Sequence, residues 1–179
     1  MKKLIIANWK NHPETLAEAK DILESANNCL ESLGEDKELS LVFCPPFIYL
    51  EEVSSVLNMS HFEHEASLGA QDIAVDDKTT LTGEITGSML KRLGVSYAII
   101  GHSERRWKLG EDDITVNKKI KAALADEITP IVCIGERVRE IGFEKVLENQ
   151  CANTFKDLTA DEMARCIVAY EPVWAISKG

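Results

Sequence analysis

The sequence predicts an α/β protein with a mostly parallel sheet, and two patterns support this prediction. Short apolar, β-branched runs alternate with longer stretches of helical periodicity along the whole chain. The first run, KLIIANW at residues 3–9, lacks polar alternation, as expected for a strand covered on both faces. Strands joined through helices in this way run parallel through right-handed crossovers. With 179 residues, 45% of them hydrophobic, we expect one domain over residues 1–179.

Six runs have the length and composition of buried strands. They span residues 3–9, 39–44, 67–72, 95–100, 130–135 and 166–171. The second run, LSLVFC, ends at Pro45 and Pro46, since proline cannot donate to a sheet. The third run, SLGAQD, predicts a strand more weakly than the others do.

Helical periodicity fills the intervals between these runs. Apolar residues recur three or four positions apart from Leu16 to Leu30, which predicts an amphipathic helix closing near Gly34. Thr159 is a plausible N-cap for the last helix. The other helices are expected from Pro46 to about residue 57, over 84–94, over 113–127 and from about residue 143.

Composition excludes several functional classes. A net charge of −10 argues against a general nucleic-acid or membrane-surface binder, and no segment approaches a membrane span. The five cysteines show no C-x-x-C spacing, so we expect reduced core residues of a cytoplasmic protein.

Polar residues follow the first, fourth and sixth expected strands, and their placement separates two architectures. An open doubly wound sheet gathers its site at one switch point, whereas a closed barrel brings all strand ends to one mouth. Asn8 and Lys10, His102 and Glu171 come from strands far apart in order, which favours a barrel. No G-x-G-x-x-G follows the first strand, so a dinucleotide cofactor is not expected.

Lys10, His102 and Glu171 together suggest proton transfer at a carbon next to a carbonyl. Each alone has a simpler interpretation: a solvated lysine, a structural histidine or a surface ion pair. We expect Ser103 to cap a short helix and the helix N-terminus to keep His102 neutral. The apolar residues 173–176 are expected to raise the pKa of Glu171 toward that of a useful base.

A metal hydrolase is a weaker hypothesis. His61, His64 and Glu65 stand in HFEHE, but the order H-x-x-H-E matches neither zincin arrangement. We therefore expect a surface loop here and no metal.

An ordered set of motifs resembles the triosephosphate isomerase family over the whole chain. The motifs are ANWK (7–10), GAQD (69–72), TGE (82–84), GHSERR (101–106), CIGE (133–136) and AYEPVWAI (169–176). The resemblance implies a TIM (β/α)8-barrel type of fold and interconversion of dihydroxyacetone phosphate and glyceraldehyde 3-phosphate through an enediolate, without a cofactor. A glutamate base and a neutral histidine are a well-known feature of this enzyme.

The resemblance also implies roles for individual residues. Glu171 is the expected base, His102 the electrophile, and Lys10 binds substrate with Asn8, while Glu104 supports Lys10. Residues 172–179 would begin the lid that closes over the phosphate. Ser177 stands where the family usually has a lid glycine whose N–H reaches the phosphate, and Lys178 and Thr80 also depart from the family pattern.

The family is normally dimeric, so a homo-oligomer is expected. The interface loop would span residues 76–84, with Thr82 reaching the neighbouring site, Gln71 nearby and Glu84 pairing with Arg105.

The length of the chain leads to a last expectation. A barrel of this kind takes ~250 residues, or ~31 per βα unit, so the sequence holds about six units of an incomplete barrel. The loops after strands seven and eight supply most of the phosphate site, and we expect weak turnover without them. Strands one and six would then be open edges that self-association, an added complementary piece or rearranged helices cover. The alternative function is an inactive assembly module that needs a separate C-terminal segment.

Overall fold

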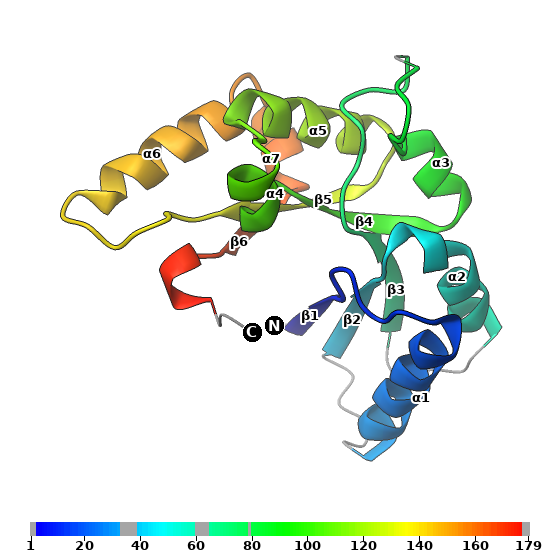
Figure 1. The fold of residues 1–179 in the computed structure, drawn as a ribbon. Helices are drawn as coiled ribbons and strands as arrows, with labels where there is room; N and C mark the ends of the chain where they lie inside the picture. The colour runs from blue at the N-terminus through cyan, green and yellow to red at the C-terminus, as the bar shows by residue number, and fades with distance from the viewer. Residues whose placement is uncertain (1–2, 33–38, 60–64, 79, 177–179) are drawn as a thin grey trace. The chain divides into compact units, whose positions relative to one another are not determined.

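The computed structural model describes residues 3–32, 39–59, 65–78 and 80–176 (Figure 1). The chain divides into two compact units. The first comprises residues 1–71 with 89–97, and the second comprises residues 72–88 with 98–179. The prediction of one domain over the whole chain stays a prediction.

Six parallel strands alternate with helices, as predicted for an incomplete TIM (β/α)8 barrel of about six βα units. The strands are β1 (Lys3–Asn8), β2 (Leu39–Cys44), β3 (Glu65–Ala70), β4 (Val95–Ile100), β5 (Thr129–Ile134) and β6 (Ile167–Tyr170). Their order in the sheet is the order in the sequence. Sequence order is what right-handed crossovers of one kind produce, and it is the strand order of this barrel class.

The first unit contains β1, β2 and β3, which lie side by side in Figure 1. Its helical elements are α1 (Leu16–Ser32), η1 (Phe47–Tyr49) and α2 (Leu50–Met59), while α3 (Gly87–Arg92) and β4 run across the boundary between the units. All six residues of β2 are buried because this strand has a neighbour on each side. Ala19, Leu23 and Leu30 of the apolar stripe of α1 are also buried, whereas Leu16 at its start is 39% exposed.

The second unit forms its own core around α5 (Asp113–Ala125), which packs against β5 and α6 (Phe143–Thr154). Val116 and Ile120 of α5 and Val132 of β5 are fully buried in this core. The remaining elements are α4 (Ser103–Lys108), α7 (Ala160–Ala164), β6 and η2 (Val173–Ala175). β5 and β6 pair in register from Ile131 with Ile167 to Ile134 with Tyr170.

Most element boundaries agree with the sequence-based expectations, and two differ for a physical reason. The helix expected over 84–94 spans only Gly87–Arg92, because the Asp77 carboxylate accepts hydrogen bonds from the N–H groups of Gly87 and Ser88 and so sets its start. The third strand ends at Ala70, two residues before Asp72, whose side chain forms ion pairs instead.

The expected N-cap of the last helix is confirmed. The Thr159 hydroxyl accepts a hydrogen bond from the Glu162 N–H, and the Glu162 side chain accepts one from the Thr159 N–H, which together form a capping box.

The cysteines are all free thiols, but not all are core residues. Cys44 and Cys133 are buried, whereas Cys29 is exposed at the end of α1, where the core prediction was wrong. Within the described ranges, no helix is both long and apolar enough to cross a membrane.

Candidate active site

Glu171 and His102, the expected base and electrophile, meet in the second unit. The carboxylate Oε1 of Glu171 lies 3.0 Å from Nε2 of His102, and their side chains are only 19% and 12% exposed. Ser103 holds the same carboxylate with two bonds. Its N–H donates to Oε2 at 3.1 Å, and its hydroxyl donates to Oε1 at 2.9 Å.

The backbone around Glu171 is held by the loop that follows β5. The Glu171 N–H donates to the Ile134 carbonyl at 2.8 Å, and the Val173 N–H donates to the Glu136 carbonyl at 3.0 Å. These bonds continue the pairing of β5 with β6 beyond the end of the sheet. The position of the carboxylate is therefore determined by two adjacent strand ends.

The expectation that apolar neighbours raise the pKa of Glu171 is wrong in direction. Burial does raise it, but hydrogen bonds from His102 and Ser103 favour the ionised form and together hold the pKa of Glu171 below its usual value. Residues 173–176 do not determine the pKa of Glu171, because its carboxylate is directed toward the start of α4 instead.

His102 itself is the N-cap of α4, and Ser103, which the sequence suggested for this role, is the first residue of the helix. Nδ1 of His102 accepts a hydrogen bond from the Glu104 N–H at 3.2 Å. A nitrogen that accepts carries no proton, so in the neutral ring the hydrogen resides on Nε2, which faces Glu171. The neutral state of His102 stays a prediction.

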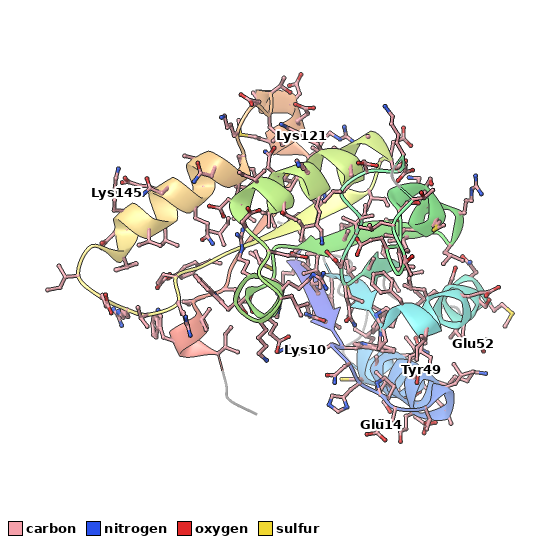
Figure 2. All side chains as sticks on the ribbon, turned by 45° about the horizontal axis from the view of Figure 1, so that its top comes forward. Lys10, Glu14, Tyr49, Glu52, Lys121 and Lys145 are labelled. Carbon is pink, nitrogen blue, oxygen red and sulfur yellow. The ribbon has the colours of Figure 1, made fainter. Side chains whose placement is uncertain are left out.

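Lys10 and Asn8 belong to the first unit, at the end of β1, where Figure 2 labels Lys10. The Lys10 backbone has φ 54°, a left-handed conformation that costs a non-glycine residue energy. Two hydrogen bonds support it: the Lys10 N–H donates to Oδ1 of Asn8, and Nε2 of Gln71 donates to the Lys10 carbonyl. Asn8 and Gln71 thus both hold the loop that carries Lys10.

The other predicted site residues lie in the second unit or outside the described ranges. Arg105 pairs with Asp72 at 2.8 Å and with Glu111 at 2.6 Å, and not with Glu84 of the same chain. Thr82 and Glu84 are exposed. Ser177 lies outside the described residues.

Glu104 occupies the first turn of α4. Its carboxylate lies 3.5 Å from Nζ of Lys108, which is one helical turn further along. The predicted support of Lys10 by Glu104 stays a prediction.

Glu136 is a site residue that the sequence reasoning quoted only within a motif. It is 2% exposed, and its carboxylate accepts hydrogen bonds from the Tyr170 hydroxyl and from Nε1 of Trp174 at 2.6 Å. Burial raises its pKa, but these bonds outweigh burial and leave the pKa of Glu136 lowered. A glutamate directly after a buried strand was the signal that could have identified it.

The metal-hydrolase hypothesis gains no support from the structure. His61 and His64 lie outside the described residues, and in the part of the chain that the structure describes no three His, Cys, Asp or Glu side chains gather to hold a metal ion.

Comparisons with known proteins identify the family. The family model for triosephosphate isomerase matches residues 3–179. Triosephosphate isomerase of Endomicrobium trichonymphae is 40% identical over 99% of this chain and 69% of its own length. Those of Trichodesmium erythraeum and Thermoanaerobacter pseudethanolicus are each 43% identical over the whole chain, which covers 72% and 70% of their lengths.

The fold and these matches together define an isomerase built on strands and helices of the (β/α) barrel type. More particularly, the chain belongs to the triosephosphate isomerase family.

Proposed function

We propose that this chain interconverts dihydroxyacetone phosphate and glyceraldehyde 3-phosphate by proton transfer through an enediolate, without a cofactor. The observation that carries the proposal is the contact of 3.0 Å between the Glu171 carboxylate and Nε2 of His102. A carboxylate and a neutral imidazole at this distance can serve one substrate, as base and as hydrogen-bond donor.

Glu171 is the proposed base. It removes a proton from the carbon next to the carbonyl; the C–H electron pair forms the carbon–carbon double bond of the enediolate, and the carbonyl π pair moves to the oxygen. The same carboxyl returns the proton to the neighbouring carbon, while the hydroxyl proton passes from one enediolate oxygen to the other. The carboxylate must first leave its contacts with His102 and Ser103, which together lower its pKa. Once these are broken, burial remains and raises the pKa, so Glu171 becomes a stronger base.

His102 and Lys10 are the proposed electrophiles. The Nε2–H of His102 donates to the substrate oxygen as negative charge develops there, and neutral imidazole can do so without first giving up its proton. Lys10 supplies positive charge for an anionic substrate in a chain of net charge −10, and Asn8 is a proposed substrate-binding residue beside it. In this proposal Ser103 and Glu104 are supporting residues, and Ser177 contacts the phosphate.

A homo-oligomer is part of the proposal. The exposed loop that contains Thr82 and Glu84 would meet a second chain near Gln71 and Arg105. Exposure of Leu81 in this loop, at 60%, supports the proposal because an apolar side chain gains stability when a partner covers it.

The test is isomerase turnover of the purified chain compared with its Glu171→Gln variant, which keeps the shape of the side chain but cannot act as a base. We expect turnover about 10²–10⁴-fold above that of the variant, the usual contribution of a positioned acid–base group. Turnover equal to that of Glu171→Gln would contradict the proposal and favour the alternative of an inactive assembly module.

A further inference from the structure

We propose that Gly135 and Gln150 are positioning residues that set the depth at which Glu171 enters the site. Neither touches the Glu171 carboxylate. They act on the backbone of Glu171, and the inference rests on the proposed function because it concerns the placement of the proposed base.

The backbone of Glu171 lies directly on the Cα of Gly135. A Cβ placed on Gly135 would fall 2.0 Å from the carbonyl oxygen of Glu171, 2.5 Å from its carbonyl carbon and 3.0 Å from the Pro172 nitrogen. All three atoms belong to the backbone, so no side-chain rotation relieves the clash. Gly135 shows no left-handed φ, unlike five other glycines, so alanine is compatible with its own conformation. The absence of a side chain at Gly135 therefore makes room for the backbone of Glu171 and Pro172.

Gln150 holds Gly135 in this position through the Gly135 N–H. Its Oε1 accepts a hydrogen bond from the Gly135 N–H at 3.0 Å, and Gln150 is 9% exposed. Gln150 lies on α6, whose helical geometry fixes the origin of the side chain. The Gly135 peptide is thus clamped between α6 and the Glu171 segment.

The clamp acts at the point where strand pairing ends. The Glu171 N–H bonds to Ile134 and the Val173 N–H bonds to Glu136, the two residues that flank Gly135. Any shift of Gly135 is passed to Glu171 through these bonds. A misplacement of about 1 Å at a reacting group can lower a rate about 10²-fold. Turnover should therefore respond to small changes in the contact between Gly135 and the Glu171 backbone.

The first experiment compares Gly135→Ala with Gly142→Ala. The second variant is the control, because it introduces backbone strain away from Glu171. Gly142 has φ 88° with nothing within 4 Å of an added Cβ, so alanine there is strained without touching Glu171. We expect Gly135→Ala to lower kcat about 10²-fold with little change in KM, and Gly142→Ala to leave kcat within about threefold. Equal values of kcat for the two variants, measured under conditions where both are folded, would overturn the inference.

A second pair of variants tests the same positioning role if Gly135→Ala does not fold. Gln150→Leu removes the acceptor and leaves the Gly135 N–H buried and unpaired, whereas Gln150→Glu retains an acceptor oxygen. We expect kcat to fall about tenfold in Gln150→Leu and to recover in Gln150→Glu, since an unpaired buried donor shifts to find a partner. Equal kcat in the wild type and Gln150→Leu would count against the clamp.

The same assays on a Glu171→Gln background separate this inference from the proposed function. If Glu171→Gln lowers turnover and Gly135→Ala lowers it no further on that background, both stand, because the two changes remove one contribution. If Glu171→Gln itself has no effect, the proposed function fails. If Glu171→Gln lowers turnover but Gly135→Ala matches Gly142→Ala, only the inference about positioning fails.

Discussion

At the scale of single residues, Glu171 illustrates how hydrogen bonds can outweigh burial. Burial alone would favour the neutral acid, yet three donated hydrogen bonds from two adjacent residues favour the carboxylate. In the resting site Glu171 is therefore held in its ionised form. Its pKa depends on hydrogen bonds that the carboxylate must break before it can act as a base. This coupling predicts a pH-dependent contribution to stability.

We predict that Ser103→Ala destabilises the protein by about 1.5 kcal/mol near pH 7, the lower end for a hydrogen bond to a charged group. A folded-state pKa below the ordinary 4.5 means that the contribution is fully present above pH 4.5 and is lost as the pH falls through the folded value. Urea unfolding of the wild type and Ser103→Ala between pH 3 and pH 7, at about half-unit steps, measures the difference.

Ser55→Ala is the matched control, because the Ser55 hydroxyl donates only to the Glu51 carbonyl on an exposed part of α2. Its effect is expected to be the same at every pH. A Ser103→Ala difference that stayed constant down to pH 3 would show that the hydroxyl does not act on an ionised Glu171.

At the scale of elements, a buried ion network joins α4, α5 and the loops beside them. Nζ of Lys119 on α5 lies 2.7 Å from both carboxylate oxygens of Asp72 and 2.5 Å from Oε1 of Glu111, and Arg105 on α4 binds the same two acids. The Lys119 side chain is only 4% exposed. Although Lys119 lowers the pKa of Asp72, burial has the larger effect and the pKa of Asp72 is raised.

We predict that Lys119→Met lowers the free energy of unfolding by about 3–5 kcal/mol, because it leaves two buried carboxylates with a single cation. Chemical denaturation at pH 7 measures this change. The adjacent Lys118 is exposed, and Lys118→Met is expected to stay within about 0.5 kcal/mol of the wild type. A similarly small effect of Lys119→Met would mean that the network is solvated and contributes little.

At the scale of the whole molecule, the described residues contain six strands, and the chain covers 69–72% of the length of the three relatives described above. In β6, which pairs with β5, the side chains of Val168 and Tyr170 are 57% and 56% exposed. Large apolar side chains at this exposure are a feature of surfaces that associate.

We predict that the purified chain sediments with the mass of two chains. Thr82→Arg should shift it toward one chain, because a bulky charge in the proposed interface loop opposes association. Glu148→Arg, on the exposed face of α6, introduces the same side chain elsewhere and is expected to leave the mass unchanged. Sedimentation of the wild type as a single chain at micromolar concentration would contradict the proposed oligomer.

Patterns close in sequence were sufficient to predict much of this fold. β2 and β4 have the predicted bounds because short apolar runs between turn residues act locally. The Thr159 cap likewise depends on a partner three residues away. The ordered motifs identified the family, and the positions of His102 and Glu171 at strand ends indicated the candidate site.

Other features depend on partners distant in sequence, which only the tertiary structure could supply. Ser103 bonds to Glu171 from 68 positions away, and together with His102 it reverses the expected direction of the Glu171 pKa shift. Lys119 reaches Asp72 across 47 positions. Gly135 is constrained by the backbone of Glu171 and Pro172, which no local sequence pattern places beside it. The sequence by itself determined the elements, the family and the chemical types at the site, since these follow from local preference and order. The tertiary structure decided the charge state of a group such as Glu171 and whether a position such as Gly135 accepts a side chain. Both depend on which groups folding brings close to one another.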